Sequence, residues 1–149
     1  MPTTITIPVV IERFWETIPP VWHQTRHTIQ RVAVEQFKMT VEQFQILRRL
    51  RKGYDEVSSL AEVSQSSRSS VSKIVDALVN KGLVSRLTDT RDRRHVHLAL
   101  TEKGERLLGA IYDETEKWLG GKFQSLSLEE LELTFNAMEV LRKIFDESK

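Results

Sequence analysis

Charged side chains crowd together in the segment "TDTRDRRH", residues 88–95. They are Asp89, Arg91, Asp92, Arg93 and Arg94. Arginine carries a permanent positive charge and a fork of N–H donors, so such a cluster suits phosphate groups or an electronegative groove of DNA. Aspartates in the same segment can hold guanidinium groups in fixed orientations, and we interpret both as braces. Taken alone, the segment is more simply interpreted as a solvated charged turn, because charged turns are common.

The residues on either side of this cluster predict a β-hairpin. A short strand, "LVSRLT", comes before it, and the alternating segment "HVHLALT" follows it. The alternation places Val96, Leu98 and Leu100 on one face of the second strand. His95 and His97 lie on the other face, where we expect them near DNA or solvent rather than as metal ligands. We interpret the hairpin as the wing of a winged helix.

A helix–turn–helix is predicted just before the hairpin. The first helix covers about residues 58–63, and a serine-rich turn follows at 64–67. The second helix runs from about Ser67 to Lys81 and ends at Gly82. Its apolar residues recur at helical spacing, which indicates one buried face. The opposite face carries Ser69, Lys73, Asp76 and Asn80, flanked by Ser70 and Ser72.

Helical periodicity also marks the N-terminal part of the chain. Residues 9–37 have broadly helical apolar spacing. Proline is poorly tolerated inside a helix, so we expect a break or kink at Pro19-Pro20, with a new helix starting near Pro20. Thr40 and Gln43 have the spacing of a capping box and predict the start of the next helix.

Two helices are predicted after the hairpin. Thr101 should cap a long helix that ends at Gly120-Gly121, because glycine commonly terminates helices. Ser127 and Glu130 form a second capping box and predict the start of the final helix. That helix has an apolar stripe at helical spacing.

Composition indicates one folded domain with an uneven charge distribution. The chain has 149 residues, a net charge of +1 and no cysteine, which excludes disulfides and thiolate chemistry. Residues 66–97 hold seven basic and three acidic side chains, whereas residues 99–149 hold seven basic and eleven acidic ones. The basic middle favours a polyanionic partner. The N-terminal stretch is a poor signal peptide and no apolar run is long enough to span a bilayer, so we expect a cytoplasmic protein.

At these motifs the sequence resembles the MarR family of bacterial and archaeal transcriptional regulators. The matching elements are the start of the second helix, "SSVS", its exit "LVNKGLVSR", the wing "DTRDRR" and the helix entry "LTEKG". The resemblance extends over essentially the whole chain. One departure is the turn, where Ser64, Gln65 and Ser66 replace a glycine flanked by aliphatic residues.

The resemblance implies a mainly α fold with a small β-hairpin wing, a winged helix–turn–helix with N- and C-terminal dimerisation helices. It implies a single MarR-like domain over 1–149, with a DNA-binding core at 38–100 and dimerisation helices at 1–37 and 101–149. The expected function is that of a dimeric, sequence-specific regulator, most simply a repressor, that binds a pseudo-palindromic operator in double-stranded DNA. Apolar periodicity at both ends of the chain independently favours a homodimer.

Roles for individual residues follow from the same resemblance. Ser67 is expected to cap the second helix of the helix–turn–helix. Arg94 is expected to enter the minor groove with Asp92 as its brace, and Arg91 and Arg93 to contact the DNA backbone. The side chains expected to face the major groove are Arg68, Ser69, Ser70, Ser72 and Lys73.

Many members of the family bind small anionic or aromatic effectors. Trp22, Arg26 and Gln30 are spaced to share one helix face, and a ring beside a cation could hold a carboxylated aromatic ligand. Packing in the core or in a dimer interface is the commoner role of tryptophan, so both interpretations stay open. His23 and His27 could supply two metal ligands, but no third ligand is evident. We therefore predict no metal site and no cofactor.

Two other functional classes compete with DNA binding. A winged helix used only for protein contacts would need an apolar outer face on its second helix and a neutral wing. An enzyme would need a nucleophile with its base or a metal constellation, and the sequence has no glycine-rich phosphate loop or hydrolase signature. We predict no catalytic residues and no membrane partner.

Overall fold

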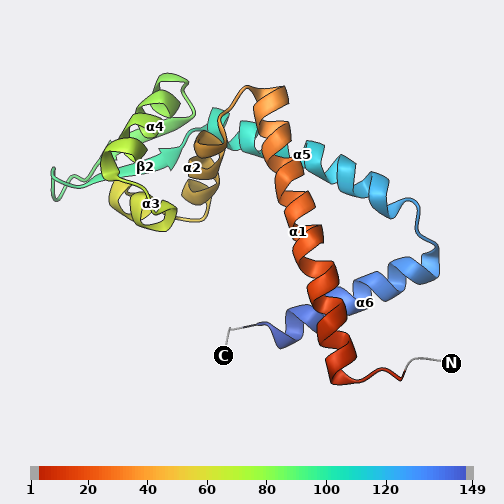
Figure 1. Cartoon of the computed structure of the whole chain (residues 1–149). Helices are drawn as coiled ribbons and strands as arrows, with labels where there is room; N and C mark the ends of the chain where they lie inside the picture. Colours follow the sequence, from red (N-terminus) through yellow and green to blue (C-terminus); the bar gives the residue numbers. More distant parts are fainter. Residues whose placement is uncertain (1–3, 147–149) are drawn as a thin grey trace. The chain divides into compact units, whose positions relative to one another are not determined.

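The computed structural model describes residues 4–146, which form two compact units joined within one helix. The first unit ends at Thr115 and the second begins at Glu116. The ends of the predicted domain, residues 1–3 and 147–149, lie outside the described residues. None of the helices in the described part is both long and apolar enough to cross a membrane. The elements (Figure 1) are α1 (Ile7–Phe37), α2 (Val41–Arg51), α3 (Val57–Ser64), α4 (Arg68–Asn80), β1 (Val84–Thr88), β2 (Val96–Leu100), α5 (Glu102–Phe123) and α6 (Leu128–Ile144).

The predicted fold class, mainly α with a β-hairpin wing, is confirmed. β1 and β2 pair antiparallel, with Val84 opposite Leu100 and Thr88 opposite Val96. In Figure 1, α2, α3 and α4 gather around this hairpin, and the loop between its strands projects beyond the helices. The predicted helix–turn–helix corresponds to α3 and α4.

One hydrophobic core holds the first unit together. Its largest fully buried side chains include Phe44 and Leu47 from α2, Leu60 from α3, Leu78 from α4 and Leu108 from α5. Burying a leucine or phenylalanine side chain contributes about 1.5–3 kcal/mol. Since helices and hairpin share this core, α4 and the hairpin are held at a defined position relative to each other.

Both predicted capping boxes are present. The Gln43 backbone N–H donates to Thr40 Oγ1 at 3.0 Å, and the Thr40 N–H donates to Gln43 Oε1 at 3.2 Å. In α6, the Glu130 N–H donates to Ser127 Oγ at 3.1 Å and the Ser127 N–H donates to Glu130 Oε2 at 2.8 Å. Each box satisfies N–H groups that a helix start leaves without intrahelical partners.

The expected break at Pro19-Pro20 is wrong, because α1 continues through both prolines. The fixed φ of proline is compatible with a helix. Each proline removes one hydrogen bond, to the carbonyl four residues earlier, while the flanking turns keep theirs. In a helix of 31 residues, propagation on both sides outweighs this local loss.

The expected end of the long helix at Gly120-Gly121 is also wrong, because α5 continues to Phe123. Glycine ends a helix most effectively when it takes a positive φ, and among the described glycines only Gly53 and Gly82 do so. Gly120 and Gly121 keep helical conformations at a cost of about 1 kcal/mol each. The predicted cap at the start of α5 is confirmed, since Thr101 Oγ1 accepts the N–H of the third residue after it at 3.1 Å.

The turn between α3 and α4 is made by Gln65 in a left-handed conformation, with φ of 52° and ψ of 40°. Its N–H donates to Glu62 O at 3.1 Å, and the Ser66 N–H donates to Ala61 O at 3.0 Å. A non-glycine residue in this conformation is strained, because its Cβ approaches the backbone. Gln65 therefore forms a left-handed turn in which a glycine would be unstrained.

Candidate nucleic-acid interface

The polar face of α4 is exposed, as its sequence pattern predicted. Val71, Val75 and Leu78 are buried against the core. On the opposite side Ser69 and Lys73 are exposed. An outer face of hydroxyl and cationic groups has the chemistry needed to hydrogen-bond base edges and phosphates. The exposed members of the predicted set on this helix are Arg68, Ser69, Ser70 and Lys73, and Ser72 is half-buried.

Ser67 caps α4, which confirms the role predicted for it. The Ser70 N–H donates to Ser67 Oγ at 3.2 Å, and the hydroxyls of Ser67 and Ser70 lie 2.8 Å apart. Ser69 Oγ also lies 3.2 Å from the Ser67 hydroxyl. These hydroxyls surround the helix N-terminus, where the backbone dipole favours negative charge.

Asp92 braces Arg94 in the loop between the strands. Asp92 Oδ1 accepts the Arg94 backbone N–H at 3.0 Å and its Nε–H at 3.2 Å, while Oδ2 accepts from Nη2 at 3.4 Å. The Arg94 hydrogen bonds, first from its side chain and then from its backbone, lower the pKa of Asp92. The side chain of Arg94 is 89% exposed, so the brace orients a cation that points into solvent.

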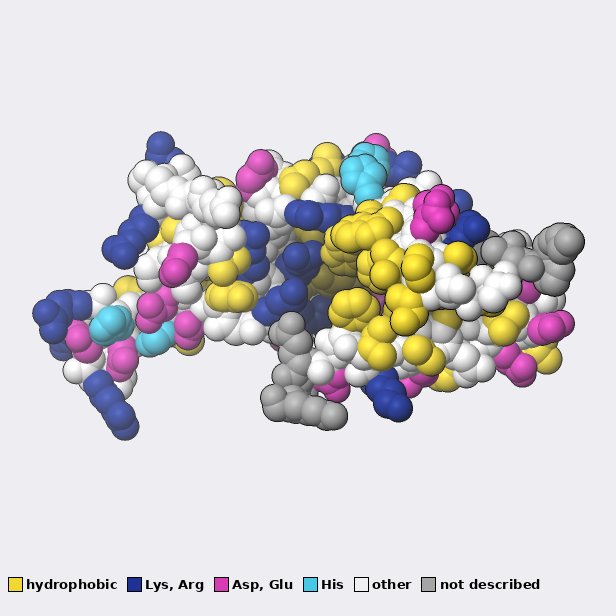
Figure 2. Space-filling model, turned by 60° about the horizontal axis from the view of Figure 1, so that its bottom comes forward, with side chains coloured by type: hydrophobic (Ala, Val, Ile, Leu, Met, Phe, Trp, Pro, Cys, Tyr) yellow, Lys and Arg dark blue, Asp and Glu magenta, His cyan; other side chains and the backbone are white. Residues whose placement is uncertain are grey.

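Asp89 acts differently from the brace that we expected. Its Oδ1 accepts the backbone N–H of Arg91 at 2.8 Å, and this bond is the largest cause of its lowered pKa. Its Oδ2 lies 3.7 Å from His97 Nε2. Asp89 therefore shapes the turn rather than orienting a guanidinium group. Figure 2 shows basic, acidic and histidine side chains gathered at the projecting hairpin.

A groove between α4 and the hairpin brings part of the predicted site together. Arg68 and Ser72 line it from α4, and Arg94 lines it from the loop. Arg86 on β1 also lines the groove and forms an ion pair with Asp76 of α4. We did not predict Arg86, although it stands in the basic stretch of the sequence. Ser69, Ser70, Lys73, Arg91 and Arg93 do not line this groove.

The residues predicted for ligand binding are only partly assembled. Arg26 and Gln30 line a small hollow together with His23 and His27. Trp22 does not line it and is 56% exposed. The structure therefore brings the predicted cation and amide together without the predicted aromatic ring.

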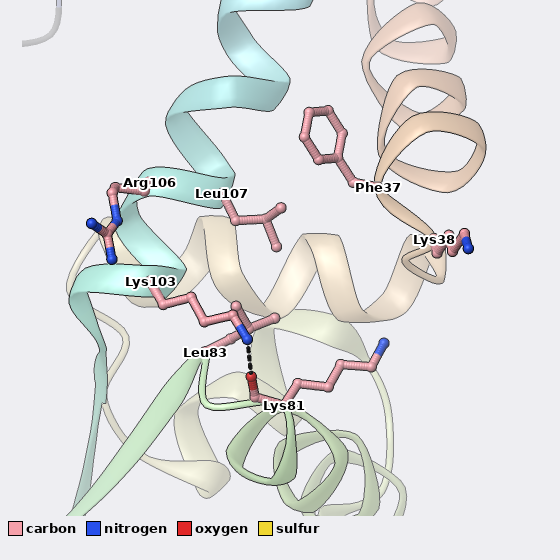
Figure 3. Close-up of a pocket in the computed structure, with 7 residues that line it drawn as sticks. All are labelled: Phe37, Lys38, Lys81, Leu83, Lys103, Arg106 and Leu107. Carbon is pink, nitrogen blue, oxygen red and sulfur yellow. Dashed lines mark hydrogen bonds between the residues drawn. The ribbon is translucent and has the colours of Figure 1, made fainter.

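A larger hollow of about 530 Å³ lies where α1, the end of α4 and the start of α5 meet. In Figure 3, Phe37 and Leu107 face each other across it, and Lys103 Nζ donates to Lys81 O at 2.9 Å. The hollow combines apolar walls with a basic rim, a set of groups that suits an amphipathic anion. The sequence carried no signal for it, because its residues come from separate elements. The lining residues are Phe37, Lys38, Lys81, Leu83, Lys103, Arg106 and Leu107.

A polar, basic recognition helix beside an arginine-bearing wing defines a winged helix–turn–helix of the DNA-binding class. Residues 39–96 match the family model described as MarR family. The chain is 32% identical over 117 residues to the HTH-type transcriptional regulator FarR of Neisseria gonorrhoeae, covering 78% of this chain and 80% of that one. The chain belongs to the MarR family of transcriptional regulators.

Solved structures show the same fold. The transcriptional regulator Tm0710 from Thermotoga maritima matches with a TM-score of 0.82 and 21% identity, over 89% of this chain and 94% of that chain. A mutant of S. aureus MepR bound to an oligodeoxyribonucleotide matches with a TM-score of 0.67 and 22% identity, over 95% and 99% of the two chains.

Proposed function

We propose that this protein is a dimeric, sequence-specific DNA-binding repressor that works in the cytoplasm. The observation that carries the proposal is the pairing of the exposed polar face of α4 with the Asp92-braced Arg94. In this arrangement α4 enters the major groove and Arg94 the adjacent minor groove, whose negative potential attracts guanidinium groups. The MepR neighbour bound to an oligodeoxyribonucleotide supports the choice of partner.

The remaining predicted residues have matching roles. Arg68, Ser69 and Lys73 contact base edges or phosphates in the major groove, and Arg91 and Arg93 contact the backbone. Occupation of a promoter by such a protein blocks transcription, which is the basis for proposing a repressor. The alternative of a pure protein-interaction module is disfavoured, because the outer face of α4 is polar.

Exposed apolar side chains support a homodimer. On α1 these include Ile11, Trp15 and Trp22, at 51%, 68% and 56% exposure. On α6 no residue is buried, and Phe135 and Met138 are 64% and 52% exposed. Monomeric proteins rarely leave so much apolar surface in water, and a second copy would cover it while pairing two recognition helices. A monomeric mass by light scattering would contradict this part of the proposal.

DNA binding is tested by fluorescence anisotropy on the duplex upstream of the protein's own gene and on a scrambled duplex, from low to physiological salt. We expect tighter binding to the upstream duplex at physiological salt. Arg94→Ala should weaken binding and lower the salt slope by about one unit, because it removes one cation whose binding in the groove releases DNA counterions. Lys52→Ala is the charge-matched control, since Lys52 is an exposed cation at the end of α2, outside α4 and the wing. Equal, salt-sensitive binding to both duplexes would contradict sequence-specific function.

We also propose that an aromatic carboxylate releases the DNA by binding beside Arg26, Gln30 and Trp22. Burial, and then the charges of Arg48 and Arg26, lower the pKa of Arg49, which indicates an electropositive region that favours an anion. Benzoate is a suitable probe, followed through tryptophan fluorescence. Arg26→Ala should abolish the response, and an unchanged response would contradict this site.

A further inference from the structure

Three potential metal ligands meet where the wing contacts the helix–turn–helix. Asp55 and Glu56 immediately precede α3, and His97 lies on β2. One ligand atom from each lies within 4.8 Å of the other two. The backbone is held in register at this point, because the Leu98 N–H donates to Asp55 O at 2.7 Å. Residues distant in sequence are thus placed on a rigid junction.

The geometry suits metal coordination after small side-chain rotations. His97 Nδ1 lies 3.0 Å from Asp55 Oδ2. Ligand atoms around a tetrahedral zinc ion are about 3.3 Å apart, as follows from metal–ligand bonds of about 2.0–2.1 Å. Glu56 occupies the N-cap position of α3 without making a side-chain capping bond. Its Oε1 lies 3.9 Å from Nδ1 of the neighbouring His95, and its Oε2 accepts from Ser58 Oγ at 3.4 Å. All three side chains are partly exposed, so water can complete the coordination.

The second nitrogen of His97 faces another carboxylate. Its Nε2 lies 3.7 Å from Asp89 Oδ2, in the turn that follows β1. When Nδ1 binds a metal, the ring proton resides on Nε2, and an acceptor on that side orients the ring and raises its basicity. Asp89 is positioned to be that acceptor.

We propose that Asp55, Glu56 and His97 bind a divalent transition-metal ion, with Asp89 as the hydrogen-bond partner of His97. One imidazole with two carboxylates favours zinc or a similar ion over magnesium or calcium, which prefer oxygen ligands alone. For His97 this proposal differs from our sequence-based expectation that neither His95 nor His97 is a metal ligand. The sequence did not indicate the site, because Asp55 and Glu56 are remote from His97 along the chain.

The ion would act on DNA binding, an effect that rests on the proposed function. Four carboxylates, from Asp55, Glu56, Asp89 and Asp92, surround the two histidines at the start of the second strand. Their negative charge lies close to the arginines proposed to contact phosphates. A bound cation compensates part of that charge and ties the wing to the start of α3, so it should tighten DNA binding.

The site is tested on the full chain, stripped with chelator and titrated with Zn²⁺ by calorimetry. We expect one Zn²⁺ per chain, with little response to Mg²⁺. Asp55→Asn and His97→Ala should each weaken Zn²⁺ binding by about 100-fold or more, and Asp89→Asn by about 10-fold. The double variant His23→Ala, His27→Ala removes the other histidine pair and should bind as the wild type does. Asp55→Asn is nearly isosteric, so it separates loss of a ligand from loss of folding.

The outcomes separate the site from the proposed function. Absence of Zn²⁺ binding, or binding that survives His97→Ala and Asp55→Asn, overturns the metal site. If Zn²⁺ binds but DNA affinity is the same with and without it, the site stands and its regulatory effect is overturned. Failure to bind DNA under any condition contradicts the proposed function and leaves the calorimetric result to decide the site.

Discussion

Alanine at position 104 should destabilise this protein, although alanine favours helices more than glycine does. Gly104 is buried in the first turn of α5, and a Cβ there would lie 2.2 Å from the carbonyl oxygen of Leu83 and 3.1 Å from its carbonyl carbon. Both are backbone atoms, so no side-chain rotation relieves the clash. The same oxygen accepts the Thr101 N–H at 3.0 Å. The substitution must push α5 away from the residue that leads into β1.

The size of the effect follows from two opposing contributions. Overpacking of this kind costs about 1–3 kcal/mol, while the helix propensity of alanine returns about 1 kcal/mol. Because the added Cβ meets backbone atoms, we take the upper limit of the overpacking cost, about 3 kcal/mol. The free energy of unfolding then falls by about 2 kcal/mol, which lowers Tm by about 6 °C. Gly109 is the matched control in the same helix, since nothing lies within 4 Å of its Cβ position. Gly109→Ala should raise Tm by about 3 °C.

Thermal unfolding followed by circular dichroism measures both variants, at equal protein concentration because a dimer's Tm depends on concentration. The DNA affinity of Gly104→Ala should fall as well, since the root of the hairpin shifts. If Gly104→Ala unfolds at or above the wild-type temperature while Gly109→Ala behaves as expected, then α5 does not pack closely against Leu83.

Three further variants test local features of the interface. Gln65→Gly should stabilise the protein by about 0.5–1 kcal/mol, because glycine adopts the left-handed conformation at φ 52° without strain. Chemical denaturation measures this gain, and its absence would mean that the turn is not strained. Ser67→Ala should cost about 1 kcal/mol through loss of the α4 cap, whereas Ser66→Ala, outside the cap, should cost much less; equal costs would argue against the cap. The carboxyl of Asp92 should titrate below its ordinary pKa in a ¹³C NMR experiment, and its pKa should rise in Arg94→Ala. Because the pKa of Asp92 is lower in the folded protein, the brace stabilises the fold at pH values above the ordinary carboxyl pKa, and this stabilisation is lost as the pH falls through the folded pKa. If Arg94→Ala leaves the titration of Asp92 unchanged, Arg94 does not lower this pKa.

Features set by neighbouring residues were predictable. The exposed face of α4 follows from the 3.6-residue repeat, so Ser69 and Lys73 could be placed from the sequence. The hydroxyl caps and the Asp92–Arg94 brace also join residues two or three positions apart. Asp89 shows the limit even at short range, because the sequence did not indicate whether its carboxylate would meet a side chain or the backbone N–H of Arg91.

The low helix preference of proline and glycine did not predict the bounds of the two long helices. Pro19 and Pro20 cost α1 only local hydrogen bonds, and Gly120 and Gly121 cost α5 only backbone entropy. Such preferences amount to about 1–3 kcal/mol per residue, and propagation of the surrounding turns exceeds them. A pattern that weakens a helix therefore did not predict its end.

The sequence by itself determined the order of helices and strands, the polar face of α4 and the charged tip of the wing, because each depends on short-range backbone geometry and side-chain periodicity. It did not determine that α1 is continuous or where α5 ends. The tertiary structure alone decided that Arg86 lines the groove beside α4 and that Phe37 faces Leu107. It also placed Asp55 Oδ2 at 3.0 Å from His97 Nδ1. These contacts join segments that meet only because α2, α4, α5 and the hairpin share one buried core. The packing of apolar side chains elsewhere in the core determines which residues come into contact. The polar residues themselves therefore do not indicate which neighbours they will have.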